Sequence, residues 1–466
     1  MEIIMRFLAL FVLVFLLSGC NNGTEKKSTD TSNTKETTDA VEKLLSDWVQ
    51  GEYLPSKNFA NICSNPRLNN KYQDLAGDYV EEKNWIRSWS HETYLWYNEL
   101  PDIDPASIQD PIKYFDQMKT SAITSSGSAK DRFHFAVDTE ESTLLSETGI
   151  SVGYGTSAKQ DRETGRIYVT YTEPNSPAQK ENITRGTEIL AADGVYIGSV
   201  ITDEQLDIFN SALFPVTAGE SNSFIIRKPN SIFIENITLT SSSTTEVPVY
   251  LTTTFEANDE KIGYLVLNSF NIETAELQLI NAVNQLKSAQ ISDLILDLRY
   301  NGGGYLGISA VLGTMIAGNK AYGEIFESMV YNDKYTQYDP INGQLIEPFL
   351  FPETTLGFST TKGTPLPKLN LSRVFIIATG NTASASEALI NSLRGIDVEV
   401  ILIGETTTGK PYGFYGADNC GITYYTIQFK GTNAKGYGDY TDGFIPSAID
   451  NGTDLVKGCL VADDLS

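Results

Sequence analysis

A serine in the last third of the chain stands where a protein can activate a hydroxyl group. Ser384 belongs to residues 381–387, NTASASE, which join the apolar run 374–378 to a predicted helix. A helix N-terminus exposes backbone N–H groups and favours negative charge, and the N–H of Ala385 is a natural donor to an oxyanion. The pattern predicts a nucleophile. Ser384 and Glu387 also form a capping-box pattern, which starts helices without any catalysis.

Three consecutive glycines offer a second donor. They end the segment 297–304, DLRYNGGG, which continues the apolar run 294–298. Glycine has no Cβ, so its backbone can approach a ligand closely, and Gly303 is the candidate for the second oxyanion donor. A tight turn between a strand and a helix also needs glycine. The glycine run therefore gains weight only in combination with the serine loop.

The serine also needs a base, and the chain holds only two histidines, His91 and His134. His91 falls in a helical pattern and His134 in a predicted strand, and we interpret both as structural. Lys410, in residues 404–413 (GETTTGKPYG), directly follows the apolar run 398–403 and is the better candidate. Lysine acts as a base only when neutral, which requires burial to lower its pKa from ~10.4 towards ~7–8.

Alternating strands and helices must position these loops. The predicted elements are strands at 262–267, 294–298, 374–378 and 398–403 and helices at 274–289 and 384–393. This order predicts a parallel sheet with crossover helices. Because the carboxyl ends of neighbouring parallel strands meet at one edge of a sheet, Ser384 and Lys410 are expected to lie close together.

Two further regions precede this sheet. From about residue 40 to His134 the pattern is helical, and Trp85, Trp89 and Trp96 are predicted to share one face of a helix that Pro101 ends. From about 148 to 240 the chain changes to short β-rich runs separated by Gly, Pro and Asn. A Ser/Thr-rich connector at 241–246 then leads into the sheet.

The first residues predict export. Arg6 provides a positive charge, the apolar run 7–17 is too short to span a membrane comfortably, and residues 17–20, LSGC, resemble a bacterial lipobox. That resemblance implies removal of residues 1–19 and acylation of Cys20, so that the membrane is a partner through a lipid anchor. The polar residues that follow, to about 39, are predicted to form a flexible tether. A plain secretory signal with a chance cysteine is the alternative.

Composition excludes several classes of function. The 466 residues suffice for two to four domains. A formal net charge of −25 argues against nucleic acid as a partner. The scarcity of histidine gives no support to a metal site, and no metal or organic cofactor is implied.

Export permits disulfides among the remaining cysteines. We expect Cys420 to pair with Cys459, which would leave Cys63 free.

The β-rich region resembles a PDZ domain of the kind found in bacterial proteases. The resemblance rests on residues 175–178 (NSPA), 183–186 (ITRG) and 188–194 (EILAADG). It implies that Gly149, Ile150 and Ser151 form a loop whose N–H groups bind a peptide C-terminus, while the peptide adds a strand to the sheet. A β-rich spacer without a ligand is the alternative.

The chain as a whole resembles the C-terminal processing (tail-specific) protease family of Ser/Lys peptidases. The matching motifs are 262–267, 297–304, 382–387 and 404–410, within a resemblance covering roughly 140–445. The family implies a crotonase-like (ClpP/crotonase) core, with Ser384 rather than Ser386 as nucleophile and Lys410 as base. Gly303 and Ala385 match its oxyanion positions.

This sequence departs from the family in two respects near the base. Many members carry glutamine four residues after the lysine, where this chain has Phe414, and the interval from the serine to the lysine is about one residue longer. The residue that orients Lys410 is therefore open. Two other readings also stay open: an inactive PDZ-type peptide receptor on a protease scaffold, and a tricorn-like serine peptidase that uses His134 as base.

The sequence thus predicts a multidomain α/β and α+β protein. Its expected parts are a signal peptide (1–19), a tether (20–39), a mostly helical domain (40–147), a PDZ-like domain (148–240) and a protease core (247–466). The expected function is that of a lipid-anchored, extracytoplasmic serine endopeptidase of the bacterial cell envelope. Its expected substrates are polypeptides with exposed apolar C-termini.

Overall fold

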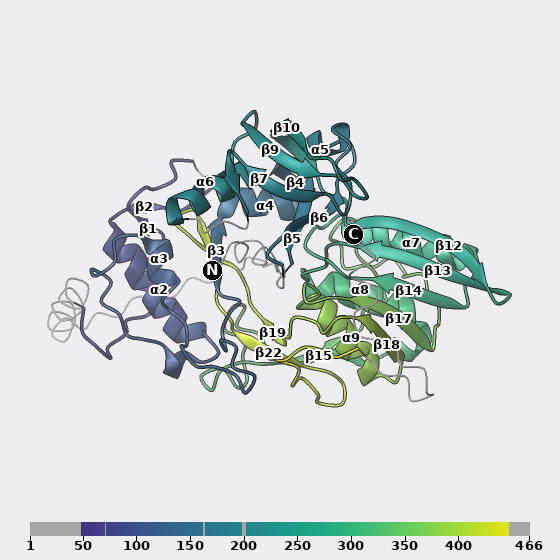
Figure 1. The fold of residues 1–466 in the computed structure, drawn as a ribbon. Coiled ribbons are helices and arrows are strands. Elements are labelled where there is room, and N and C mark those ends of the chain that lie inside the picture. Colours follow the sequence, from purple (N-terminus) through teal and green to yellow (C-terminus); the bar gives the residue numbers. More distant parts are fainter. Residues whose placement is uncertain (1–47, 70, 162–163, 198–201, 447–466) are drawn as a thin grey trace.

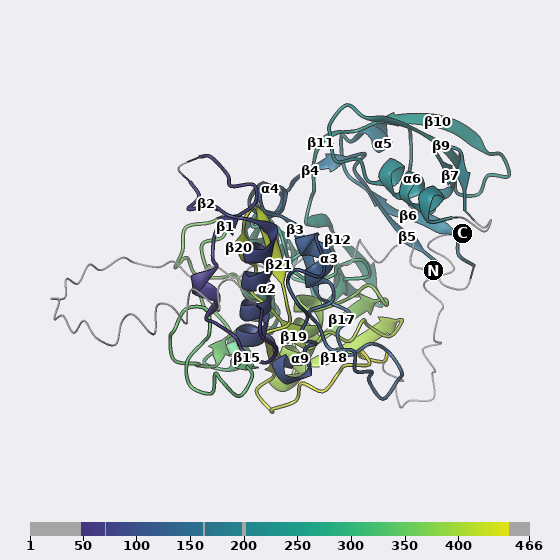
Figure 2. The same cartoon turned by 90° about the vertical axis from the view of Figure 1, so that its left-hand side faces the viewer.

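The computed structural model describes residues 48–69, 71–161, 164–197 and 202–446. The predicted signal peptide, tether, Cys20 and Cys459 lie outside these residues. Three regions follow one another along the chain: a purple-to-blue N-terminal region, a teal β-rich domain and a green-to-yellow C-terminal domain (Figure 1). Turning the molecule by 90° shows the β-rich domain standing off from the other two (Figure 2).

The N-terminal region combines short helices with irregular segments. Its helices are η1 Ser56–Asn58, α2 Tyr79–Thr93, η2 Tyr97–Glu99, α3 Pro111–Phe115 and α4 Thr139–Thr148, and its strands are β1 Ile62–Cys63, β2 Leu75–Ala76 and β3 Phe135–Asp138. The region is less helical than its pattern predicted. Pro101 and Pro105 fall between α2 and α3, Pro111 is the first residue of α3, and each removes a backbone donor that a continuous helix would need.

Helix α2 starts and stops at identifiable residues. Asp78 and Glu81 form a capping box at its start, and the stacked rings of Trp85 and Trp89 lie 5.1 Å apart on its buried face. The prediction that Trp96 shares this helix is wrong. The helix ends at Thr93, because the chain turns extended there and the N–H of residue 95 donates to the carbonyl of residue 427 instead of continuing the helix.

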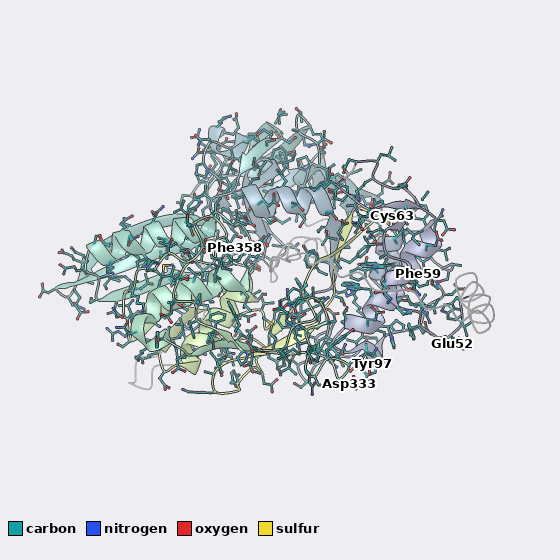
Figure 3. The ribbon with its side chains drawn as sticks, turned by 180° about the vertical axis from the view of Figure 1, so that it is seen from behind. Glu52, Phe59, Cys63, Tyr97, Asp333 and Phe358 are labelled. Carbon is teal, nitrogen blue, oxygen red and sulfur yellow. A yellow bond between two sulfur atoms is a disulfide. The ribbon has the colours of Figure 1, made fainter. Side chains whose placement is uncertain are left out.

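The predicted disulfide is also wrong. Cys63 of β1 is bonded to Cys420, so Cys420 does not pair with Cys459 and Cys63 is not a free thiol. Figure 3 shows Cys63 beside the yellow hairpin that carries Cys420. The partners are 357 residues apart in sequence, and only the packing of the N-terminal region on this hairpin brings them together. The ion pair of Arg67 with Asp418, at 2.8 Å, joins the same two segments.

The β-rich domain is a twisted sheet with two helices. It contains β4 Ile150–Gly153, β5 Thr156–Gln160, β6 Ile167–Thr172, α5 Pro177–Lys180, β7 Glu188–Ala192, β8 Val195–Tyr196, α6 Asp203–Leu213, β9 Ser221–Arg227 and β10 Glu235–Thr240. The strand order is β10-β9-β7-β6-β5, with β8 paired to β7. Strand β5 is therefore at the end of the sheet, and one of its edges has no paired strand within the described residues.

The predicted connector is itself a strand. Strand β11, Ser242–Thr245, pairs antiparallel with β4, and Thr244 lies opposite Ser151. The β-rich domain is thus joined to the C-terminal domain by a two-stranded ribbon.

The predicted parallel sheet is confirmed in the C-terminal domain. Its elements are β12 Val249–Ala257, β13 Glu260–Leu267, α7 Ala275–Ser288, β14 Asp293–Asp297, α8 Leu306–Ala317, η3 Gly318–Ala321, β17 Arg373–Ala378, α9 Ala385–Gly395 and β18 Glu399–Gly404. The strand order is β12-β13-β14-β17-β18, and every pair except β12–β13 is parallel. The central strands and the helices packed on them share the largest apolar core.

The remaining strands link the C-terminal domain to the N-terminal region. Strands β15 Ile325–Val330, β16 Phe349–Leu350, β19 Tyr412–Gly413 and β22 Phe429–Thr432 form one sheet, and β20 Ala417–Asn419 and β21 Ile422–Tyr425 form another with β3. Because β3 pairs with β21, the N-terminal region packs on the segment that follows Lys410. Within the residues described here, no helix has the length and apolar character needed to cross a membrane.

Candidate active site

Ser384 lies between the end of β17 and the start of α9. Its backbone has φ 55° and ψ −117°, a conformation that costs a non-glycine residue ~1–3 kcal/mol and is concentrated at functional sites. The neighbouring Ser386 has a structural task, because its Oγ donates to the carbonyl of Asn301 at 3.0 Å. Ser384 is therefore the serine that the backbone holds in a strained position at the helix start.

Hydrogen bonds join the serine loop to the loops on either side. Thr382 Oγ1 donates to the Leu298 carbonyl at 2.8 Å, and the N–H of Thr408 donates to the Thr382 carbonyl at 2.9 Å. The three predicted loops thus meet at the carboxyl edge of β14, β17 and β18, as the order of parallel strands predicted.

Glycine is required where the glycine loop meets Ser384. Gly303 has φ +109°, and a Cβ at this position would lie 2.8 Å from Ser384 Cβ and 3.0 Å from the Ala385 nitrogen. Such contacts are closer than two carbon side chains tolerate. The close approach that the triple glycine predicted is therefore present, and it is directed at Ser384.

The two predicted oxyanion donors differ in whether their N–H groups already form hydrogen bonds. No hydrogen bond from the N–H of Ala385 is found within the part of the chain that the structure describes. The N–H of Gly303 instead donates to Asn301 Oδ1 at 2.9 Å, and Asn301 Nδ2 donates to the Leu267 carbonyl at 3.1 Å. A substrate oxyanion would therefore have to replace the Asn301 side chain at Gly303.

Lys410 is buried in an apolar environment. It is 7% exposed, and its Nζ lies 4.0 Å from the ring centre of Phe414 and 5.3 Å from that of Phe133. No carboxylate lies within 4.0 Å of this Nζ among the residues described. Burial lowers the pKa of Lys410 to about 7, while the charges of Asp131 and Glu387 act in the opposite direction. A large neutral fraction is thus present at neutral pH, which a base requires.

The N-terminal region supplies part of this environment. Asp131 and Phe133 come from the segment before β3, and Arg132 between them donates from Nη2 to the Thr408 carbonyl at 2.6 Å. Asp131 is held in turn by the hydroxyl of Tyr94 at 2.7 Å. Sequence reasoning missed this contribution, because no local pattern indicates that residues about 280 positions before the lysine will pack on it.

A buried glutamate connects the serine to the lysine. Glu387 Oε2 accepts from the N–H of Ser384 at 3.0 Å and from the N–H of Lys410 at 2.8 Å. Its Oε1 accepts from the N–H of Gly409 at 2.7 Å and from Thr407 Oγ1 at 2.6 Å. Burial raises the pKa of Glu387, and these four donors oppose that shift. One carboxylate thus fixes both backbone segments relative to each other.

The sequence did carry a signal for Glu387. Its position three residues after Ser384 predicted a capping box, and the bond to the Ser384 N–H is one half of that motif. The contacts to the Lys410 loop could not be predicted, because they depend on the distance between the loop that follows β17 and the loop that follows β18.

The histidines have other surroundings. His134 Nε2 bonds to the Phe115 carbonyl at 2.8 Å, its ring stacks on Phe115 at 3.7 Å, and its Nδ1 lies 3.8 Å from Asp131. Burial lowers the pKa of His134 to about 4. His91 stacks on Tyr53 at 3.7 Å. Both side chains thus have partners within the N-terminal region.

The predicted carboxylate-binding loop is engaged within the chain. The N–H of Gly149 donates to the Leu145 carbonyl and that of Ile150 to Thr148 Oγ1, while Ser151 belongs to the ladder with β11. Two of the three predicted donors are therefore already used. Residues 153–155 lead directly into β5; Gly153 ends the ladder with β11, opposite Ser242, and Tyr154 and Gly155 follow it.

A strained serine, a buried lysine and a glycine loop at the edge of an α/β sheet define a serine hydrolase type of site. Residues 261–413 match the model of peptidase family S41, and residues 81–133 match that of the peptidase S41 N-terminal domain. Two segments of the chain are thus similar to domains of the peptidase S41 family.

Curated relatives carry corresponding names. The carboxyl-terminal-processing protease of Picosynechococcus sp. is 27% identical over 270 residues, which are 58% of this chain and 56% of the relative. Carboxy-terminal processing protease CtpB of Bacillus subtilis is 25% identical over 288 residues, 60% of this chain and 51% of the relative. The matched segments thus span about half the length of these relatives.

A solved structure has the same fold. A Bacteroides fragilis protein assigned to the S41 proteases superimposes with a TM-score of 0.56 at 24% identity, covering 82% of this chain and 91% of that one.

Proposed function

We propose that this protein is a serine endopeptidase that cleaves polypeptides through an acyl-enzyme, with Ser384 as nucleophile and Lys410 as general base. The single observation that carries the proposal is the Glu387 carboxylate, whose Oε2 accepts from the N–H groups of both Ser384 and Lys410. The strained serine and the lowered pKa of the lysine support the same roles.

The reaction follows from these positions. Neutral Lys410 removes the proton from Ser384 Oγ, which attacks the substrate carbonyl carbon. The negative charge that forms on the carbonyl oxygen is stabilised by the N–H of Ala385 and, once Asn301 has moved, by that of Gly303. The Lys410 ammonium then protonates the leaving amine, and water hydrolyses the acyl-enzyme by the reverse sequence of proton transfers.

The test compares Ser384→Ala and Lys410→Ala with the unmodified protein on an unfolded polypeptide substrate. Both variants should lose turnover through kcat, because both residues act on the transition state. His134→Ala should keep activity. An inactive His134→Ala together with an active Lys410→Ala would assign the base to the histidine, and an inactive unmodified protein that still binds peptides would favour the receptor.

The β-rich domain is proposed to select substrates by their C-termini, as a PDZ domain does. Strand β5 leaves an edge open within the described residues, and an apolar groove beside it is lined by Thr156 and Ala158 of the strand, by Leu213 and Phe214 at the end of α6 and, for the rest, mainly by core side chains of the domain. A peptide added to this edge would place its carboxylate at residues 153–155. This placement replaces the loop 149–151 in the proposal, because the donors of Gly149 and Ile150 are used elsewhere.

A lipid anchor at Cys20 remains a proposal from the LSGC motif and would hold the enzyme at the bacterial cell envelope. Metabolic labelling with a palmitate analogue should mark the unmodified protein but not Cys20→Ser. An unlabelled, fully soluble unmodified protein would end this idea.

A further inference from the structure

Basic side chains from two domains gather around one tyrosine beside the glycine loop. Tyr300 directly precedes Asn301 of that loop. The Nζ of Lys159, on β5, lies 5.9 Å from its ring centre, and the guanidinium of Arg185 lies 5.0 Å from it and donates to Tyr300 Oη at 2.9 Å. Arg299 of the C-terminal domain lies 6.0 Å from the same ring centre. Two of these three cations thus belong to the β-rich domain.

Arg299 and Lys159 differ in whether a carboxylate lies close enough to form an ion pair. Arg299 forms a two-pronged ion pair with Asp297, whose carboxylate also accepts from the Tyr264 hydroxyl. Glu405 and Asp161 lie near enough to Lys159 to favour its charge, and Glu405 Oε2 accepts from the N–H of residue 380 at 3.3 Å. No carboxylate among the described residues lies within 4.0 Å of Lys159 Nζ.

Lys159 is therefore a half-buried ammonium for which the described part of the chain supplies no close counter-ion. Burial lowers its pKa, because the charged form loses water, and the charges of Arg185 and Arg299 lower it further. Buried lysines are normally paired. A carboxylate brought in from outside would relieve this cost, so the position favours an anionic ligand group.

The position of Lys159 on β5 indicates which part of a peptide would supply that group. Successive side chains of a strand alternate between its two faces. Thr156 and Ala158 line the apolar groove, whereas Lys159 points to the contact between the β-rich domain and Tyr300 of the C-terminal domain. A peptide antiparallel to β5, with its last residue near Thr156, would bring the residue about three positions upstream beside Lys159.

We propose that Lys159, together with Arg185 and Tyr300, forms a subsite for an acidic side chain about three residues before the C-terminus of a substrate. The inference rests on the proposed binding of C-termini along β5. It adds a charge preference to the apolar preference of the groove, and it places the selecting residues between that groove and the loop that contacts Ser384.

The test uses two peptides that are identical except for Glu or Lys at the third position before a free C-terminus. The unmodified protein should cleave the Glu peptide with a kcat/KM at least tenfold higher, since a bond between charged groups in a partly buried site changes affinity by ~10-fold or more. Lys159→Glu should reverse the preference. Lys228→Glu makes the same charge change beyond β9, far from β5 in the strand order, and should leave the preference as it was.

Reversal separates recognition from a structural role. If Lys159→Glu lowered kcat/KM equally for both peptides, Lys159 would only stabilise the contact between the two domains, and the inference would be overturned. A ratio near one in the unmodified protein would overturn it as well.

A binding measurement separates the inference from the proposed catalysis. In the Ser384→Ala variant, the affinities of both peptides can be compared by fluorescence anisotropy without cleavage. Tighter binding of the Glu peptide there supports the subsite even if no turnover is found. Equal affinities, unchanged by Lys159→Glu, reject the subsite while leaving the peptidase proposal in place.

Discussion

At the scale of single residues, the site contains two buried ionisable groups whose surroundings have opposite effects on their charged forms. Lys410 is surrounded by Phe414 and Phe133 and has its charge disfavoured. Glu387 is equally buried but receives four hydrogen-bond donors. The carboxylate can therefore bind the backbone on both sides of the site, while the amine remains available as a base.

Activity should depend on pH through Lys410. In the proposed mechanism the neutral lysine is the active form, and it predominates above its pKa of about 7. The value of kcat/KM should therefore fall as pH decreases through about 7 and reach a plateau above pH 8. A pH profile of peptide cleavage between 5 and 9 measures this. A profile that stays flat down to pH 5 would instead indicate His134 as the base, since the pKa of that residue is lowered to about 4.

Glu387→Gln should impair catalysis without preventing peptide binding. Glutamine has one acceptor oxygen and no charge, so it cannot accept from all four donors as the two carboxylate oxygens do. Its amide nitrogen would face either the N–H groups of Ser384 and Lys410 or the donors of Thr407 and Gly409. Each lost charged hydrogen bond is worth ~1.5–3 kcal/mol, and we expect kcat to fall by at least ~10-fold. The matched control is Glu399→Gln, because Glu399 is an exposed carboxylate at the start of β18. Equal kcat in both variants would contradict the role assigned to Glu387.

At the scale of elements, short parallel strands place the loops, and contacts from distant elements complete them. Strands β14, β17 and β18 end at the same edge. The segment before β3 then covers Lys410, and β3 itself is held by β21. The disulfide between Cys63 and Cys420 fixes the same assembly from the other side.

Removing that disulfide should loosen the N-terminal region. The loss of a native disulfide typically costs ~2–5 kcal/mol, so the Cys63→Ser, Cys420→Ser double variant should unfold at lower denaturant concentration. Fluorescence of Trp85 and Trp89, which pack in this region, reports the transition. Cys459→Ser is the control and should leave the midpoint unchanged. A larger effect of Cys459→Ser than of the double variant would return the pairing to Cys420 and Cys459.

At the scale of the whole molecule, the site is shared among three regions. The C-terminal domain holds Ser384 and Lys410, and the N-terminal region covers Lys410. Arg185 of the β-rich domain contacts Tyr300, which belongs to the glycine loop segment of the C-terminal domain. The ribbon of β4 and β11 is the covalent route between the β-rich domain and the other two. Substrate binding on β5 would therefore occur beside the loop that holds Gly303.

Cleavage should depend on a free C-terminal carboxylate. An amidated peptide loses the charge that backbone donors at 153–155 would bind, and at ~1.5–3 kcal/mol for such bonds its kcat/KM should fall by roughly 10- to 100-fold. The comparison needs matched free-acid and amidated peptides. Equal kcat/KM for the two would contradict selection by C-termini, although it would leave the Ser384 and Lys410 proposal untouched.

The sequence by itself determined the local features of this protein. The apolar runs predicted β13, β14, β17 and β18, the amphipathic pattern predicted α7, and the strand order brought the loops of Ser384, Gly303 and Lys410 to one edge. These features depend on hydrophobic periodicity, turn residues and the geometry of parallel strands. Each of them is encoded within a few neighbouring residues.

Only the tertiary structure decided which distant groups meet. Three contacts join segments whose separation in sequence carries no information about their distance in space. They are the pairing of Cys63 with Cys420, the contact of Phe133 with Lys410 and the bonds of Glu387 to the Lys410 loop. The packing of three regions against one another sets these distances. The sequence also placed a donor at Gly303 but could not show that the Asn301 side chain occupies it, because that side chain is held in turn by the carbonyl of the distant Leu267.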